Sequence, residues 1–267
     1  MKILVPTDFS DNADKALDFA LKISKINGAS ITLLYAYYGV YDFAAQAAVI
    51  LDQLEKDANE SMEKLLASPE FQGVKVDSKI IHGTVATAVT STAYREDYDL
   101  IVMGTQGASG IKKVLIGSNT AHVIKDSQVP VLAVPTNSSY SDLREITVAV
   151  ELHHEDEKFF HKMFKLTQKT ALPYEILHVD TDEGFEKSLT LKGLMSYLGE
   201  KYPDEKFTHL NLKADNLQKG LEKYLKDIPH CLLVMFSKQK SFFEYIFNKS
   251  ASMQMAYHTH VPLLVIK

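Results

Sequence analysis

The apolar run at residues 100–103 is followed by glycine and serine residues at defined spacings. Two residues separate Gly104 from Gly107, and nine residues separate Gly107 from the pair Gly117-Ser118. Glycine lets the backbone approach another group without a Cβ in the way, and the free N–H groups at a helix start bind anions. The spacing therefore predicts a loop that holds phosphate, with the Ser118 hydroxyl at the start of a helix.

One carboxylate far away in the sequence belongs to the same predicted site. Asp8 follows the apolar run at residues 3–5, in the segment Pro6-Thr7-Asp8. In open α/β sheets, ligands bind beyond the carboxyl ends of the strands where the strand order reverses. If the strand order reverses between the first and fourth strands, as the family resemblance given below implies, Asp8 and the glycine loop face each other across a cleft.

Each of these residues also has a purely structural explanation. Asp8 could cap the helix that begins near Ser10, Ser118 could cap its own helix, and the glycines could be turn residues. For any one residue these alternatives stay open. The complete set favours the phosphate site, because turns alone do not require all of its members.

Short apolar runs alternate with amphipathic helical patterns in the first half of the chain. The runs lie at residues 3–5, 31–36, 79–81, 100–103 and 131–134, and they are continuous or nearly so. Continuous apolar runs are typical of strands buried on both faces of a parallel sheet. Ser10 is expected to cap the first helix between them. The alternation predicts an open α/β sheet with right-handed crossovers.

The whole pattern then occurs a second time. After a polar segment at 136–144, EITVAVELH has the character of the opening KILVPTDFS. Pro262 lies 132 positions after Pro130, whereas Ile146 lies 143 positions after Ile3, so the first half holds eleven extra residues within 37–82. We therefore predict two homologous tandem domains, at 1–135 and 145–267, joined by a linker at 136–144.

The second repeat lacks the glycines of the first. Matched by position, Gly104 becomes Phe236, Gly107 becomes Gln239, Gly117 becomes Lys249 and Asp8 becomes Glu151; only Ser118 keeps its type, as Ser250. Large side chains thus stand where the backbone would have to meet phosphate. We expect only the first domain to bind the ligand.

The first half resembles the universal stress protein family, within the larger group of adenine-nucleotide-binding α/β folds. The motif G-x2-G-x9-G-[ST] of its ATP-binding members is matched at every position by Gly104, Gly107, Gly117 and Ser118. The segments LVPTDFS and VPVLAVP are also family-like. The resemblance spans nearly all of 1–135 and, more faintly, 144–267. It implies two Rossmann-like parallel sheets with strand order 3-2-1-4-5.

The resemblance also implies a ligand, which is one ATP per chain, with or without Mg²⁺. By similarity, the Asp8 carboxylate and the backbone around Thr7 and Ala36 hold the adenosine. The glycines approach the ribose and phosphates, and the helix start holds the β and γ phosphates. The expected binding residues are Pro6, Thr7, Asp8, Ala36, Met103, Gly104, Gly107, Gly117, Ser118 and Asn119. We expect no catalytic residue and no protein metal ligand.

Three classes of function remain: a nucleotide-binding module, an enzyme that uses the same cleft, and a structural scaffold without a ligand. The sequence shows no Ser-His-Asp set, no paired acid/base carboxylates and no Walker-type lysine followed by Ser or Thr. This favours a non-catalytic, nucleotide-dependent module of the stress response over a slow ATP hydrolase or a nucleotidyl-transfer enzyme that uses the same cleft.

Composition limits the partners and the location. The 267 residues carry a net charge of −5, which argues against a nucleic-acid surface. No apolar run approaches the roughly 18 residues of a membrane span, so the cytoplasm is expected.

Cys231 is the single cysteine, which excludes an intramolecular disulfide, and it is expected in the core. We expect the last strands, 131–134 and 263–266, to pair within one chain. Association into a homodimer is left open.

Overall fold

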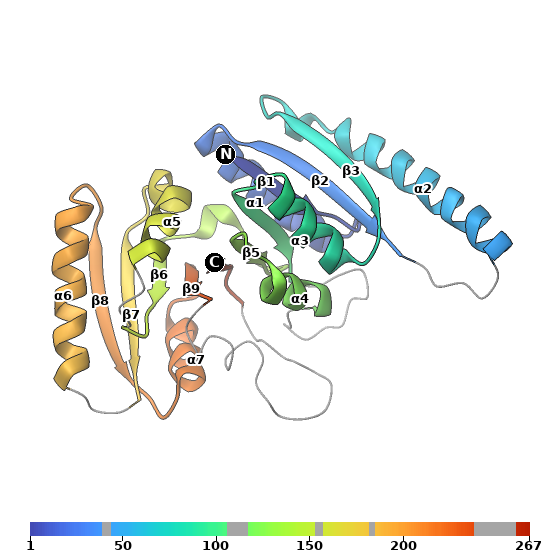
Figure 1. Cartoon of the computed structure of the whole chain (residues 1–267). Coiled ribbons are helices and arrows are strands. Elements are labelled where there is room, and N and C mark those ends of the chain that lie inside the picture. The colour runs from blue at the N-terminus through green and yellow to red at the C-terminus, as the bar shows by residue number, and fades with distance from the viewer. Residues whose placement is uncertain (39–43, 106–116, 153–156, 182–184, 238–259) are drawn as a thin grey trace. The chain divides into compact units, whose positions relative to one another are not determined.

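The computed structural model describes residues 1–38, 44–105, 117–152, 157–181, 185–237 and 260–267. The chain divides into two compact units, Met1–Thr136 and Asn137–Lys267 (Figure 1). Each unit contains five parallel strands that alternate with helices, so the predicted α/β class with an internal repeat is confirmed.

The first unit has the predicted strand order. Its strands are β1 (Lys2–Pro6), β2 (Ser30–Tyr37), β3 (Val76–His82), β4 (Leu100–Gly104) and β5 (Val131–Val134), and its helices are α1 (Asp11–Asn27), α2 (Ala44–Leu66), α3 (Val85–Arg95) and α4 (Ser118–Asp126), with a 3-10 turn at Pro69–Phe71. The order β3-β2-β1-β4-β5 is parallel throughout. It reverses between β1 and β4, which is where the sequence predicts the cleft.

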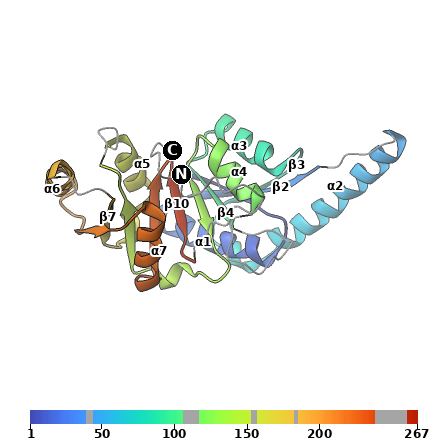
Figure 2. The ribbon, with the colours of Figure 1, turned by 90° about the horizontal axis from the view of Figure 1, so that it is seen from below.

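Helices cover both faces of this sheet. Figure 2 shows α3 and α4 on one side of the strands and α1 on the other. The central strand β1 is buried from Ile3 to Pro6, as its continuous apolar run predicts. The prediction of burial on both faces is wrong for β3, where none of the seven residues is fully buried. Because β3 lies at the edge of the sheet, its outer side chains need not be apolar.

Local signals fix the ends of α1. Ser10 is its N-cap, as predicted, and the Ser10 hydroxyl accepts a hydrogen bond from the backbone N–H of Ala13 (3.4 Å). At the other end Gly28 adopts the left-handed conformation with φ 66°, and its N–H donates to the Ser24 carbonyl. These two caps place the first turn of α1 directly after the loop that contains Asp8.

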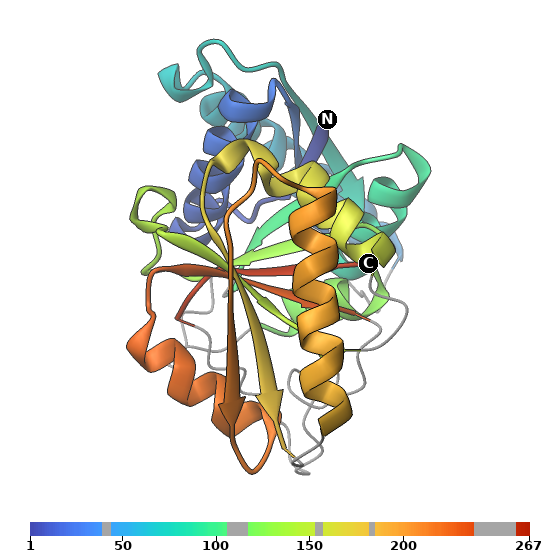
Figure 3. The ribbon, with the colours of Figure 1, turned by 90° about the vertical axis from the view of Figure 1, so that its left-hand side faces the viewer.

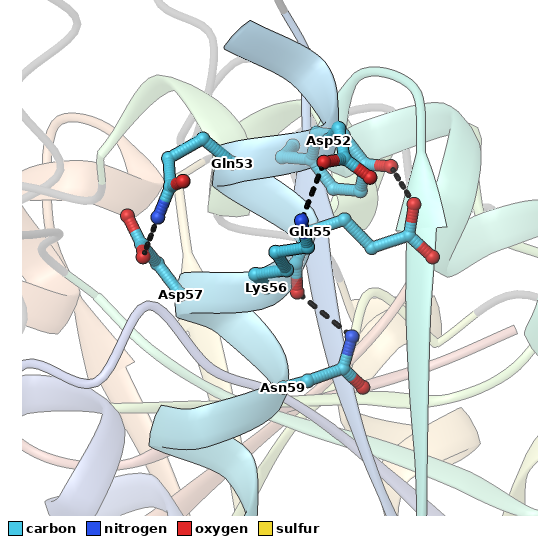
Figure 4. Close-up of polar contacts among 7 residues, drawn as sticks. Asp52, Gln53, Glu55, Lys56, Asp57 and Asn59 are labelled. Carbon is cyan, nitrogen blue, oxygen red and sulfur yellow. Dashed lines mark hydrogen bonds and ion pairs between the residues drawn. The ribbon is translucent and has the colours of Figure 1, made fainter. Parts of the chain in front are cut away.

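The exposed face of α2 carries polar contacts at helical spacing, shown in Figure 4. Lys56 donates to Asp52 (2.7 Å), Gln53 donates to Asp57 (2.7 Å), and Asn59 donates to the backbone carbonyl of Glu55 (2.8 Å). Such exposed pairs contribute little to the stability of a helix, because solvent screens them. The buried side chains of Ala58 and Met62 therefore stabilise the packing of α2 more than these contacts do.

The second unit repeats this topology. Its strands are β6 (Glu145–Ala149), β7 (Tyr174–Asp180), β8 (Phe207–Lys213), β9 (Cys231–Phe236) and β10 (Leu263–Ile266), and its helices are α5 (Glu157–Thr167), α6 (Phe185–Lys201) and α7 (Leu217–Asp227), with 3-10 turns at Tyr140–Asp142 and Gln168–Thr170. The parallel order is β8-β7-β6-β9-β10, again 3-2-1-4-5. Figure 3 shows α6 lying along β8.

Backbone hydrogen bonds recur at the spacings read from the sequence. The Thr7 N–H donates to the Leu34 carbonyl, and 143 positions later the Val150 N–H donates to the Leu177 carbonyl, both at 2.9 Å. Unusual backbone recurs as well, because Phe9 has φ 59° and Leu152, its counterpart, has φ 61°. The internal repeat is therefore visible in backbone detail.

Strand register refines the position of the insertion. Val76 of β3 pairs with Ile31, and Phe207 of β8 pairs with Tyr174. The separation of these partners is 45 residues in the first unit and 33 in the second. The first unit therefore has twelve extra residues between its second and third strands, and one residue fewer before its fourth strand. The net difference is the eleven residues expected from the sequence.

The segment 136–144, predicted as a polar linker, has local order. It contains the 3-10 turn Tyr140–Asp142, the buried side chain of Leu143, and an Arg144 guanidinium that donates to the Ser141 carbonyl (2.8 Å). None of the helices within the described ranges has the length and apolar character needed to cross a bilayer.

Candidate functional site

A pocket opens at the carboxyl ends of β1 and β4 in the first unit. Its volume is about 160 Å³. It is lined by Pro6, Thr7, Asp8, Ala13, Leu34, Ala36, Val85, Met103, Gly104, Gly117, Ser118, Asn119 and Thr120. Nine of the ten residues predicted to bind ATP are among them, and the tenth, Gly107, lies outside the described residues. The structure thus brings together segments that are about a hundred positions apart in the sequence.

Four lining residues were not predicted from the sequence. Leu34 and Val85 come from β2 and α3, and Ala13 comes from α1. Their apolar side chains carry no chemical signal, so only the three-dimensional arrangement identifies them. Thr120 is different, because it directly follows Asn119 in the segment GSNT that begins at Gly117. Extending the predicted set of binding residues by one position along this helix would have included it.

The loop after β1 is held by its own side chains. Thr7 accepts a hydrogen bond on Oγ1 from the backbone N–H of Phe9 (3.0 Å). The left-handed conformation of Phe9, uncommon outside glycine, turns the chain sharply there. The Phe9 ring stacks on Tyr35 with centroids 5.1 Å apart. The turn places Asp8 at the rim of the pocket, where it is exposed.

Asp8 has a structural role in addition to its place in the pocket. Its Oδ1 accepts hydrogen bonds from the backbone N–H of Ser10 (3.2 Å) and from the Ser10 hydroxyl. Asp8 does not cap α1, since Ser10 does. Instead, the Asp8 carboxylate orients the residue that caps α1.

Gly104 is required by packing within the protein. A Cβ at Gly104 would lie 2.7 Å from the backbone oxygen of Asn12 and 3.1 Å from the Asn12 carbonyl carbon. The sequence analysis explained this glycine by approach of the backbone to ribose and phosphate. The structure supplies another reason, which is that the first turn of α1 packs directly on the end of β4.

The start of α4 presents backbone donors to the pocket that have no acceptor within the helix. Gly117 is the N-cap, with φ −61° and ψ 155°, and no side chain caps the helix. Ser118 is the first helical residue, so the alternative that Ser118 caps its own helix is wrong. The N–H groups of the first turn have no acceptor within the helix. They line the pocket at the positive end of the helix dipole, where anions are stabilised.

A side-chain hydrogen bond joins this helix start to the end of β4. The Thr120 hydroxyl donates to the Gly104 carbonyl (2.7 Å), and the Gly117 N–H donates to the Thr105 carbonyl. Both contacts use backbone atoms, so they fix the position of the helix start relative to the strand. The donors of α4 are therefore pre-oriented.

The two sides of the pocket differ in charge. Burial, and then repulsion from Asp11 and other carboxylates including Asp8, raises the pKa of Asp14 in the first turns of α1. The α1 side carries the carboxylates of Asp8 and Asp11, whereas the α4 side offers N–H donors. An anionic group is favoured on the α4 side. No cluster of three or more metal-ligating side chains occurs among the residues that the structure describes.

The corresponding place in the second unit is filled by aromatic rings. Phe236, at the position of Gly104, is fully buried; its ring stacks on Phe159 (centroids 5.4 Å apart) and meets Phe160 edge-on (5.1 Å). Gln239, Lys249 and Ser250, the other counterparts of the glycine motif, lie outside the described residues. The strand end that approaches α1 through a glycine in the first unit thus contacts α5 through a large side chain.

Comparison with known proteins agrees with the fold and with its duplication. The model of the universal stress protein family matches residues 1–135. A universal stress protein of Methanocaldococcus jannaschii is 33% identical over 138 residues, which cover 50% of this chain and 81% of that protein. One of Thermus aquaticus is 31% identical over 134 residues, covering 49% of this chain and 96% of the relative.

A solved structure matches both units together. The crystal structure of a universal stress protein from Archaeoglobus fulgidus superposes with a TM-score of 0.80 at 22% identity. The match covers 100% of this chain and 98% of that protein. At this level of identity the likeness concerns the fold.

Proposed function

Because the chain belongs to the universal stress protein family, we propose that its first unit binds one molecule of ATP and acts through binding rather than catalysis. The observation that carries this proposal is the pocket at the reversal of strand order. It combines an uncapped helix start with the carboxylate of Asp8 on the opposite wall. Ligands of open α/β sheets bind at this place.

The charges of the pocket orient the nucleotide. The phosphates lie at the start of α4, where the N–H groups of Ser118 and Asn119 and the Ser118 hydroxyl donate to them. The adenosine lies toward β1 and β2, with Asp8 as acceptor for ribose or base N–H and O–H groups and with Leu34 and Val85 as apolar walls. Pockets for ligands of this size usually measure about 300–1,000 Å³. The smaller described cavity therefore encloses part of the nucleotide.

A binding function suits the chemistry of the lining residues better than hydrolysis does. Asp8 is the one ionisable side chain among the lining residues that the structure describes, and it already accepts hydrogen bonds from Ser10. Phosphoryl transfer needs charge neutralisation and a group that orients the nucleophile. A slow ATP hydrolase or a nucleotidyl-transfer enzyme in the same pocket is the alternative, and a ligand-free scaffold is the third.

Calorimetric titration of the full chain with ATP tests the proposal. We expect one site per chain, and we expect Gly117→Val to abolish binding because a branched side chain enters the path of the phosphates. The matched control is Lys249→Val, at the corresponding position of the second repeat, which should leave the affinity unchanged. Two equivalent sites, or full binding by Gly117→Val, would contradict the proposal.

A steady-state assay separates binding from catalysis. We expect bound ATP to persist, with turnover far below the ordinary enzymatic rate of about 1 per second. Turnover at that rate, lost in Gly117→Val, would make the enzyme alternative the better one.

Some properties remain predictions from the sequence. They are a role in the stress response, a cytoplasmic location, pairing of the last strands of the two units and a homodimer.

A further inference from the structure

Two buried polar side chains at the end of β7 have atoms that lack hydrogen-bond partners. His178 is 4% exposed and Asp180 is 9% exposed. Neither Nε2 of His178 nor Oδ1 of Asp180 has a hydrogen-bond partner in the described part of the chain. Buried polar atoms in native proteins are nearly always paired, so an unpaired one requires an explanation, such as a bound water or ion.

The hydrogen bond on the other side of the His178 ring determines what Nε2 can do. Nδ1 lies 3.0 Å from the carbonyl oxygen of Val150. A carbonyl oxygen only accepts, so Nδ1 carries the proton, and Nε2 of the neutral ring presents a lone pair. Histidines that bind metal ions typically donate their other ring N–H to a backbone carbonyl or carboxylate in this way. The Val150 carbonyl therefore prepares His178 as a ligand.

His178 and Asp180 lie on the same face of the sheet. They are two positions apart in β7, so their side chains point to the same side with their Cα atoms roughly 7 Å apart. Tyr174 shares this face, and its ring contacts Phe164 of α5 edge-on, with centroids 5.1 Å apart. The pair is therefore on the face covered by α5, whereas the pocket of the first unit includes Ala36 from the opposite face of β2.

The first unit shows that this position does not require an imidazole or a carboxylate. At the corresponding places, 143 positions earlier, stand Tyr35 and Tyr37, whose rings stack 6.5 Å apart. The second unit has replaced two stacked aromatic rings by an imidazole and a carboxylate. Each of these buries an acceptor atom, which destabilises the fold if that atom stays unpaired.

We propose that His178 Nε2 and the Asp180 carboxylate are two ligands of a divalent transition-metal ion such as Zn²⁺ in the second unit. Two acceptors on one face are satisfied together by a cation. Imidazole and carboxylate are both ordinary ligands of Zn²⁺, and its remaining coordination positions take other donors such as water. The proposal does not depend on nucleotide binding, because it concerns a different unit.

A direct His178–Asp180 ion pair is the main competing explanation. A charged imidazolium would donate from Nε2 to the carboxylate, which would remove the need for a metal. Lys213 is the register partner of Asp180 in β8 and is a second source of positive charge, although its side chain is exposed. Both explanations predict that the chain takes up no ion at this place.

Metal content of the full chain distinguishes these outcomes. After removal of metal with a chelator and dialysis against buffered Zn²⁺, we expect one Zn²⁺ per chain by elemental analysis. His178→Gln and Asp180→Asn should each weaken binding at least about tenfold. His209→Gln, at an exposed histidine of β8, is the control and should bind as the parent does. No uptake by the parent, or equal uptake by His178→Gln, would overturn the proposal.

A measurement on the unmodified sequence covers the case in which a variant fails to fold. Nitrogen-15 NMR of the His178 ring should show the Nδ1–H tautomer without metal and a shift of Nε2 when Zn²⁺ is added. Gly117→Val should show the same shift, because its substitution lies in the first unit. An Nε2 that is protonated before and after addition of Zn²⁺ would establish the ion pair and refute the metal site.

Discussion

Replacing Gly104 by alanine tests how the pocket of the first unit is built. The new Cβ would lie 2.7 Å from the Asn12 backbone oxygen, although real Cβ atoms essentially never come closer than 3.0 Å to another heavy atom. The obstructing atom belongs to the backbone of α1, so it cannot turn away as a flexible side chain can. The first turn of α1 or the end of β4 has to shift.

The expected cost follows from two opposing contributions. Overpacking of this kind costs about 1–3 kcal/mol. Alanine also restricts the unfolded chain, which returns about 0.4–1 kcal/mol where the native backbone suits it; Gly104 is not among the glycines with positive φ. We therefore expect a net loss of about 1–2 kcal/mol, equivalent to roughly 4–8 °C in the melting temperature of a unit of this size.

Urea denaturation of the full chain measures this loss, and Gly193→Ala is the matched control. Gly193 lies within α6, and a Cβ there would meet no atom within 4 Å. The same substitution should therefore stabilise the second unit by about 0.5–1 kcal/mol. Gly104→Ala should also weaken ATP binding, because Ser10 and Asp8 adjoin the displaced turn. A Gly104→Ala protein as stable as the parent would refute the close approach of Asn12.

Three further predictions concern buried groups and the last strands. Burial raises the pKa of the Cys231 thiol to about 11, so a thiol reagent at neutral pH should label it only in urea concentrations that unfold the chain; rapid labelling of the native protein would contradict this. Burial raises the pKa of the Tyr174 and Tyr224 phenols. The unfolded state therefore loses these protons first, and the free energy of unfolding should fall above about pH 10, by about 1.4 kcal/mol per pH unit and group, with a smaller slope in Tyr174→Phe. One cysteine introduced into 131–134 and one into 263–266 should form a disulfide within a single chain if these strands pair. If no combination of positions gives that disulfide, the pairing is rejected.

Much of the fold could be predicted because a strand that is buried on both faces consists of consecutive apolar residues. The runs at β1, β4 and β5 are continuous because those strands are covered on both faces. In β3 the run read from the sequence covered only residues 79–81, since Asp77 and Ser78 are exposed at the sheet edge and interrupt the apolar pattern. The repeat added a second, independent reading of the same topology.

The sequence predicted those pocket residues whose type matters for chemistry. It did not predict the residues that line the pocket only because of the shape of the fold. The glycine and serine spacing identified Gly104, Gly117 and Ser118, which the structure places together in the pocket. The approach of Asn12 to Gly104 joins backbone atoms from segments 92 positions apart, and no side-chain pattern reports such a contact. His178 and Asp180 were missed for a related reason, since one histidine and one aspartate in an apolar strand resemble ordinary variation until their burial is known.

Phe236→Ala tests whether the second unit exchanged a binding site for packing. The buried Phe236 ring contacts Phe159 and Phe160 of α5, so its truncation should cost about 3–5 kcal/mol. Leu189→Ala, at a half-exposed position of α6, is the control and should change stability by less than about 0.5 kcal/mol. The truncated protein should still bind a single ATP, because Lys249 and Gln239 remain in place of glycines. A loss of stability below about 1 kcal/mol would show that the ring is dispensable to the core. A second ATP site in calorimetry would show that one side chain, rather than the whole altered motif, keeps the nucleotide out.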